Sequence, residues 1–213
     1  EALPEGLPAF FRQAGEAIAH HAWDPDNFTR PIAAQQLHRA TSCEHYLDLE
    51  VLDGEDVPRE RMKMIAWCVR KDIPVHKVGL LPQTIEEWQQ RLAVAFAEYR
   101  KWPDNPHIRR KCVLYAGMLA HFAQDLHMPL HTTVHYDGRV GPDGKSPHSG
   151  IHLKVDALLE KLPEAAARPL PAGQITPLDE VFAGVMAELR RSHAIVDRVY
   201  ELAPRLPKRE APL

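Results

Sequence analysis

The chain has 213 residues, 45% of them hydrophobic and 26% charged, and these values are ordinary for one globular domain. A formal net charge of −3 gives no overall basic field, which argues against tight nonspecific binding of nucleic acid but leaves room for a local basic patch. No apolar run reaches the length of a membrane-spanning helix. Histidine is normally scarce, and its count of 13 is the unusual number.

Apolar residues recur at helical spacing from the first helix, expected over residues 7–22, to the last, expected over 181–199. The segment DPDNFTRP is expected to end the first helix, and a second apolar stretch covers residues 37–52. Pro58 suits the first position of a third helix. Thr84 and Glu87 form a possible capping box for a long fourth helix.

The second half of the chain continues the pattern with a helix from about residue 108 to 126, ended near Pro129. Residues 135–150 are rich in Gly, Pro and Asp and predict a loop. A short helix is expected over 151–162. Because no strand pattern competes, the sequence predicts an all-α fold, a single-domain multi-helix bundle over residues 1–203 followed by a Pro-rich tail over 204–213.

The cysteines do not point to a metal knuckle or a disulfide framework. Cys43, Cys68 and Cys112 are odd in number and have no CxxC spacing. Two arrangements stay open, namely one disulfide with a free thiol or three buried thiols.

The segment HFAQDLHMPLH, residues 121–131, crowds three histidines and an aspartate into a mostly apolar run. His121 and Asp125 are four residues apart, which places both on one face of a helix, one turn apart. Several imidazoles and a carboxylate that face inward together are costly unless something satisfies them. A divalent metal ion is the usual partner.

The same spacing recurs in HLKVD, where His152 and Asp156 are again four apart on another predicted helix. With His131 between them, the two pairs make a convergent set of ligands. Zinc accepts imidazole nitrogen and carboxylate oxygen, usually four ligands in all. Iron and manganese carboxylate bundles rely on more glutamates, so the preponderance of histidine favours zinc.

These motifs resemble the zinc-dependent phospholipase C and single-strand-specific nuclease superfamily. The pattern is HxxxD, then a histidine after a short Pro-Leu step, then HxxxD or HxxxE, and the likeness extends from about Trp23 to Asp156. The resemblance implies an all-helical fold with a cluster of zinc ions and a phosphodiester hydrolase that uses a metal-bound hydroxide.

The resemblance also implies a ligand set. His45 in EHYLD would join His121 and Asp125 at one zinc ion, with Asp125 bridging to a second. Asp26 in AWDPD completes the first group, with Asp24 as the alternative, and can orient or deprotonate the attacking water, so that Asp26 and Asp125 are the catalytic candidates. The complete set of expected metal ligands is Asp26, His45, His121, Asp125, His131, His152 and Asp156.

The resemblance further implies a third zinc ion, held by an N-terminal tryptophan and a nearby histidine, so two or three ions are expected. The printed chain starts at Glu1, and His20 and His21 lie too near Asp26 to match that histidine, so the third site stays open. Members of the superfamily are exported, which implies a secreted or periplasmic location. No protein partner is predicted.

The substrate is expected to be a phosphodiester, either single-stranded nucleic acid or a phospholipid head group. Asp156 as the closing ligand favours the nuclease branch, while GIHLK echoes phospholipases. Tyr136 is a loop aromatic on which a base could stack. The alternatives of another class are a non-catalytic zinc-binding domain and a plain helical interaction module.

Any single histidine is most often structural, and this reading applies outside the ligand set. Asp48 is expected to orient a ligand imidazole rather than bind metal itself. The structural reading is given to His107, His148 and His193, while His38, His76, His127 and His135 match no ligand position.

Overall fold

The computed structural model describes residues 6–30, 35–156, 158 and 178–206. These residues form helices and no β-strand, and their isolated β-bridge joins Leu47 to Gly79. The all-α prediction is thereby confirmed for the described part of the chain. None of its helices combines the length and the apolar character needed to cross a lipid bilayer.

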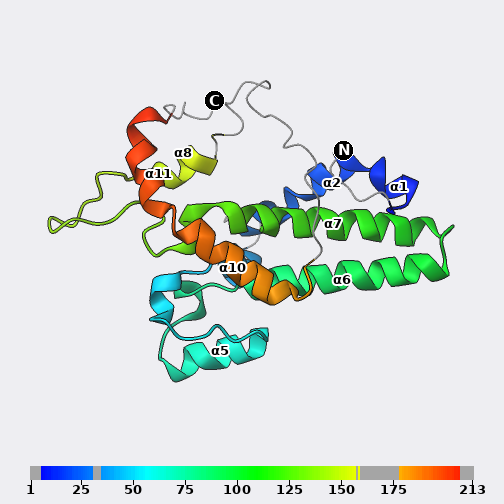
Figure 1. Cartoon of the computed structure of the whole chain (residues 1–213), viewed down its shortest axis with the longest axis horizontal. Helices are drawn as coiled ribbons and strands as arrows, with labels where there is room; N and C mark the ends of the chain where they lie inside the picture. Colours follow the sequence, from blue (N-terminus) through cyan, green and yellow to red (C-terminus); the bar gives the residue numbers. More distant parts are fainter. Residues whose placement is uncertain (1–5, 31–34, 157, 159–177, 207–213) are drawn as a thin grey trace.

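Two long antiparallel helices, α6 (Leu81–Lys101) and α7 (Pro106–His127), lie side by side at the centre of the molecule (Figure 1). The side chain of Asn105 caps α7 by accepting a hydrogen bond from the backbone N–H of His107, and Pro106 takes the first helical position. The predicted capping box of α6 is wrong, because the helix begins three residues before Thr84. The Thr84 hydroxyl lies inside the helix and donates to the Leu80 carbonyl instead.

Short helices pack around this pair. The expected first helix is split into α1 (Ala9–Arg12) and α2 (Gly15–His21), and it ends at His21, just before DPDNFTRP, as expected. Residues Asp24–Thr29 of that segment form a further helix, α3, because Pro25 in a first turn is compatible with a helix start. Pro58 lies before α5 (Arg61–Arg70), not at its first position. The remaining elements of this half are α4 (Gln35–Thr41), η1 (Ser42–Glu44), η2 (Leu49–Leu52) and η3 (Val75–Lys77).

The C-terminal half adds helices beside the end of α7. The last predicted helix is divided at Ala194 and Ile195 into α10 (Val181–His193) and α11 (Val196–Leu202). The expected helix over 151–162 is α8 (Ile151–Asp156) in the described residues, and most of its remainder lies outside them, as does most of the predicted tail. Two 3-10 turns complete the order, η4 (Pro129–Thr132) and η5 (Ala203–Arg205).

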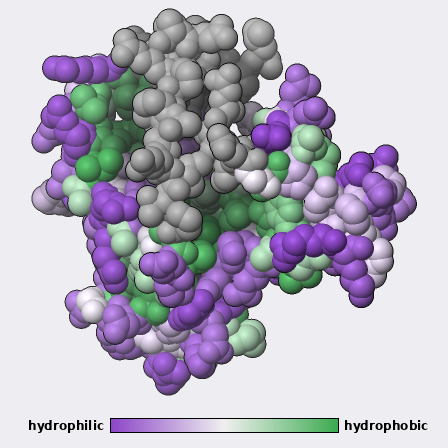
Figure 2. Space-filling view, turned by 45° about the vertical axis from the view of Figure 1, so that its right-hand side comes forward, coloured by the Kyte–Doolittle hydropathy of each residue, from purple (hydrophilic) through white to green (hydrophobic). Residues whose placement is uncertain are grey.

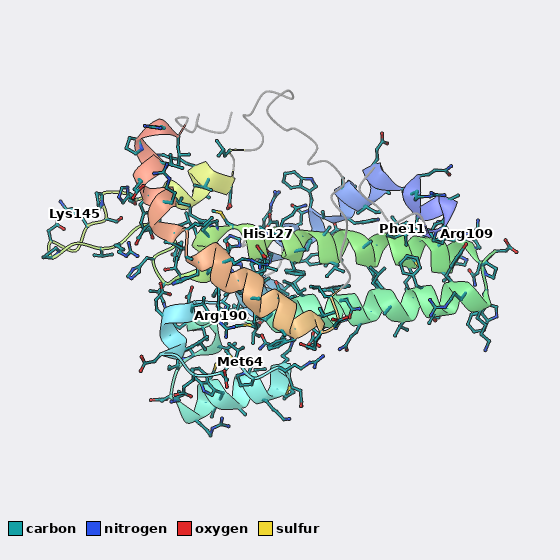
Figure 3. The ribbon with its side chains drawn as sticks, in the orientation of Figure 1. Phe11, Met64, Arg109, His127, Lys145 and Arg190 are labelled. Atoms are coloured by element: carbon teal, nitrogen blue, oxygen red, sulfur yellow. The ribbon has the colours of Figure 1, made fainter. Side chains whose placement is uncertain are left out.

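Three apolar clusters form the interior, and Met64 and Phe11 mark two of them (Figure 3). Leu126, near the end of α7, belongs to the cluster around Met64, whereas Leu130 in η4 belongs to the third cluster with Ile151 of α8. The segment that carries the HFAQDLHMPLH motif is therefore anchored in two clusters, each buried leucine contributing about 1.5–3 kcal/mol. The three cysteines are free and buried, which is the second of the two arrangements left open.

Candidate metal centre

The C-terminal end of α7 points one imidazole and one carboxylate into the molecule, as the four-residue spacing predicts. His121 and Asp125 are each 8% exposed, and Nε2 of His121 lies 3.2 Å from Oδ2 of Asp125. Both polar groups lie on the otherwise mostly apolar buried face of α7, so their desolvation has to be offset by partners.

Two further side chains reach the same point from distant parts of the sequence. His45 follows η1 and places Nδ1 3.0 Å from both Nε2 of His121 and Oδ2 of Asp125. Asp26 in α3 places Oδ1 3.7 Å from Nε2 of His121 and 3.9 Å from Nδ1 of His45. We call Asp26, His45, His121 and Oδ2 of Asp125 the first group.

The spacing of these donor atoms is close to what a small tetrahedral cation requires. Zinc–nitrogen and zinc–oxygen bonds of roughly 2.0–2.1 Å place neighbouring ligand atoms about 3.3 Å apart. Five of the six separations among these atoms run from 3.0 to 3.9 Å and bracket that value. Ligand atoms of Asp26, His45 and His121 all lie within 4.8 Å of one another. Two imidazole nitrogens and two carboxylates are also a chemical set that zinc accepts.

A second group lies beyond Asp125. His131 in η4 and His152 in α8 turn their Nε2 atoms toward each other at 2.8 Å, and Nε2 of His152 lies 3.5 Å from Oδ2 of Asp156. Suitable ligand atoms of His131, His152 and Asp156 all lie within 4.8 Å of one another, as they do for Asp26, His45 and His121. The helical spacing of HLKVD produces the His152–Asp156 pair directly.

Asp125 connects the two groups through its two oxygens. Oδ2 faces His45 and His121, while Oδ1 lies 3.2 Å from Nδ1 of His131. That nitrogen is buried and makes no aligned hydrogen bond to any described residue. The other ring nitrogen of His131, Nε2, faces His152, so Asp125 contacts the second group through the His131 ring.

The charges of the groups depend on one another. Burial by itself lowers the pKa of His121, but the hydrogen bond and the charge of Asp125 outweigh it, so that the pKa is raised. His131 follows the same balance and also has a raised pKa. For Asp125, burial opposes ionisation, yet three surrounding imidazoles hold its pKa well below the usual value. Burial and the neighbouring His131 lower the pKa of His152.

The candidate ligands contact groups that the sequence does not reveal. The backbone carbonyl of Ala22, in the turn between α2 and α3, accepts a hydrogen bond of 2.8 Å from Nδ1 of His121. Asp24 pairs with His21 instead of joining the first group. The expected contact between Asp48 and a ligand imidazole is not found among the described residues, and burial followed by repulsion from Glu50 raises the pKa of Asp48 to about 7.

Both groups open into one large cleft of about 1520 Å³. The side chain of Asp26 is 54% exposed, whereas those of His45, His121 and Asp125 are 10–11% exposed. Asp26 is therefore the member of the first group that a molecule in the cleft reaches most easily. Several large side chains and two basic residues complete the walls: Trp23, Tyr46, Tyr136, Leu153, Arg30 and Lys77. Figure 2 shows hydrophobic surface across the middle of one face, bordered by hydrophilic side chains.

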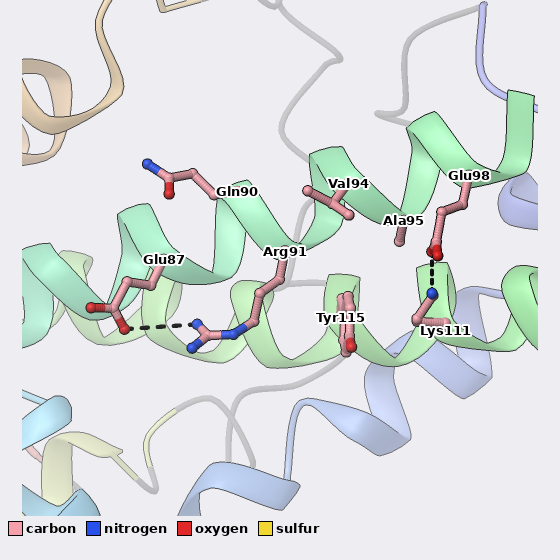
Figure 4. Close-up of a pocket in the computed structure, with 8 residues that line it drawn as sticks. All are labelled: Glu87, Gln90, Arg91, Val94, Ala95, Glu98, Lys111 and Tyr115. Carbon is pink, nitrogen blue, oxygen red and sulfur yellow. Dashed lines mark hydrogen bonds and ion pairs between the residues drawn. The ribbon is translucent and has the colours of Figure 1, made fainter.

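A smaller groove of about 370 Å³ between α6 and α7 has a different character (Figure 4). Glu87 pairs with Arg91 and Glu98 pairs with Lys111, so its carboxylates are already neutralised. No histidine lines it. The cleft at the end of α7 is therefore the better candidate for chemistry.

Comparison with protein-family models, curated proteins and solved structures gave no match to this chain, so its geometry and motifs carry the functional argument.

Proposed function

We propose that the protein is a zinc-dependent phosphodiester hydrolase, with single-stranded nucleic acid or nucleotides as the favoured substrates. The observation that supports it most is the convergence of two histidine–aspartate groups on Asp125, at the floor of an open cleft. Zinc ions in these groups would lower the pKa of bound water toward about 7 and neutralise charge on a phosphate. The motif resemblance to the phospholipase C and nuclease superfamily points to the same chemistry.

The chain's own side chains have separable roles in this proposal. His45 and His121 on one side, and His131 and His152 on the other, would supply donor nitrogens. Asp125 fixes the distance between the two groups. Asp26, which is the most exposed of the first group, can orient the attacking water and accept its proton.

The walls of the cleft favour a substrate with flat rings and several phosphates. Trp23 and Tyr136 are each 54% exposed, and bases stack on such side chains with little regard to sequence. Trp23 lies three residues before Asp26, on the same side of α3, while the ring of Tyr136 lies 5.6 Å from that of His152. Arg30 and Lys77 form no ion pair with a described residue and can meet flanking phosphates.

The first experiment measures zinc by native mass spectrometry and then screens substrates. We expect two bound ions for the two groups and hydrolysis of a chromogenic phosphodiester. Single-stranded DNA and RNA should be cleaved faster than phosphatidylcholine is. Absence of bound metal after zinc is supplied would refute the proposal. Bound zinc without hydrolysis of any of these substrates would indicate a non-catalytic zinc-binding domain. Faster turnover of phosphatidylcholine would indicate a phospholipase C.

A second experiment tests the aromatic wall with a matched pair of tryptophans. Trp23→Ala should raise KM for a single-stranded oligonucleotide by about tenfold, since stacking contributes about 1–3 kcal/mol per base, and should leave the small chromogenic diester unaffected. Trp102→Ala is the control because Trp102 is similarly exposed, at 49%, but does not line the cleft. Equal effects of the two substitutions would remove Trp23 from substrate binding.

A further inference from the structure

The four residues that follow the ligand His131 are each held by a side chain from elsewhere in the chain. Thr132 and Thr133 are completely buried, although they belong to a short turn and the loop behind it. The groups that hold this segment come from η2, α10 and α11.

The first contact comes from the last residue of α10. Nδ1 of His193 donates to the backbone carbonyl of Thr132 at 2.9 Å and lies 3.2 Å from the Thr132 hydroxyl. That hydroxyl in turn donates to the Pro129 carbonyl and closes η4. His193 therefore fixes the turn that presents His131.

The second contact comes from Glu50 in η2. One carboxylate oxygen accepts a hydrogen bond from the Thr133 hydroxyl, and the other accepts from the backbone N–H of Val134 at 3.2 Å. On the opposite side of the turn, the backbone N–H of Leu47 donates to the His131 carbonyl at 3.0 Å. The segment that carries His45 is thus tied to the backbone of the ligand in the second group.

The third contact comes from Tyr200 in α11. Its hydroxyl donates to the His135 carbonyl, its ring stacks on His148 at an interplanar angle of 8°, and the guanidinium of Arg139 lies over the same ring. These three partners belong to the loop that leads into α8, which carries His152 and Asp156. Tyr200 therefore fixes both ends of the route between the ligands of the second group.

We infer that Glu50, His193 and Tyr200 are positioning residues of the second group, a clamp that sets the geometry of His131 and His152 without touching a metal ion. The inference rests on the metal-binding part of the proposed function. It assigns to α10 and α11 a role beyond packing, because a ligand that is held by fixed backbone loses less freedom when it binds.

The test measures the zinc affinity of each group by competition with a chelator. The competition should resolve two zinc-binding steps, one for each group. His152→Ala identifies the step that belongs to the second group, because this substitution should remove that step and leave the other. His193→Leu should then weaken the second step by about tenfold or more and leave the first within about twofold. His193→Asn should restore most of the affinity, since the amide nitrogen of asparagine takes the place of Nδ1.

Tyr200→Phe separates a local effect from general unfolding, because it removes one oxygen atom and keeps the stacked ring. We expect a smaller loss, again confined to the second step. His107→Leu and Tyr99→Phe are matched controls that remove an imidazole and a hydroxyl away from the clamp. Equal weakening of both steps, no weakening, or failure of His193→Asn to restore affinity would overturn the clamp.

The clamp and the proposed reaction fail in different ways. Two zinc ions with the expected split, but no phosphodiester hydrolysis, would leave the clamp intact and refute the reaction. A wild-type protein that binds no zinc would overturn both.

Discussion

Histidine occurs in two kinds of surroundings in this protein, and the neighbours of each ring distinguish a candidate ligand from a candidate positioning residue. His121 faces another imidazole and a carboxylate at about 3 Å, a crowding that is favourable when a cation is shared. His193 instead donates to a backbone carbonyl and was expected to be structural. The residue type alone does not separate ligands from positioning residues, because both exploit the same two nitrogens.

Replacement of single ligands should divide the centre into its two groups. His121→Ala should abolish zinc binding at the first group and His152→Ala at the second, with each lowering phosphodiesterase activity by about 100-fold or more. The measurement is zinc stoichiometry together with hydrolysis of the chromogenic diester, with His107→Ala as the control. Near wild-type activity in either ligand variant would show that its residue is assigned wrongly.

The stabilisation given by zinc should depend on pH. In metal-free protein the raised pKa values of His121 and His131 stabilise the fold below about pH 6.5, and this contribution is lost as the pH rises through the raised values. The lowered pKa of Asp125 keeps its carboxylate charged throughout this range. Because zinc requires neutral imidazoles, the increase in Tm on zinc addition should be larger at pH 8 than at pH 6. An increase that is independent of pH, measured by calorimetry, would contradict this assignment of protons.

At the scale of elements, the first group depends on how closely α2 approaches α7. Gly117 lies one turn before His121, and a Cβ at that position would stand 2.5 Å from Cβ of His21 and 2.8 Å from the Ile18 carbonyl oxygen. Only glycine allows this contact. The close packing brings the Ala22 carbonyl to His121 and places α3, which carries Asp26, beside the other members of the first group.

Gly117→Ala should therefore push α2 away from α7. We expect a loss of about 1–3 kcal/mol in the free energy of unfolding and a weaker first zinc-binding step, with the second step unaffected. Gly184→Ala is the matched control on α10, because the added methyl would meet only the flexible end of the Leu178 side chain. Denaturant unfolding and zinc competition provide the two measurements, and a stable Gly117→Ala protein with an unchanged first step would refute this account.

At the scale of the whole molecule, the two groups connect segments that are distant in sequence. Asp26 and His45 come from the N-terminal quarter, His121 and His131 from the centre, and His152 from a helix after a long loop. Metal ions at this position would cross-link these segments, so that metal affinity and fold stability become linked.

Chelation should therefore lower the melting temperature. At a free zinc concentration of about 100 times Kd, binding stabilises the folded state by about 2.7 kcal/mol, which corresponds to roughly 5–10 °C for a chain of this size. Differential scanning calorimetry with a chelator, and again after zinc is restored, measures the change. A Tm that is the same in both states would show that the ions do not contribute to folding.

The sequence by itself determined the helical class, the long helices and the two HxxxD pairs, because helical periodicity and a four-residue spacing are local properties. It also predicted a metal site, for which the structure brings suitable side chains together, and the choice of zinc stays a prediction. Only the tertiary structure decided the split of the first and last predicted helices, the start of α6 before Thr84, and the placement of Asp26 rather than Asp24 beside His121. Only the fold shows that Ala22, Glu50, His193 and Tyr200 make hydrogen bonds to the candidate ligands and their loops. These contacts join residues up to about a hundred positions apart, partly through backbone carbonyls that every residue carries, so no local pattern in the sequence can mark them.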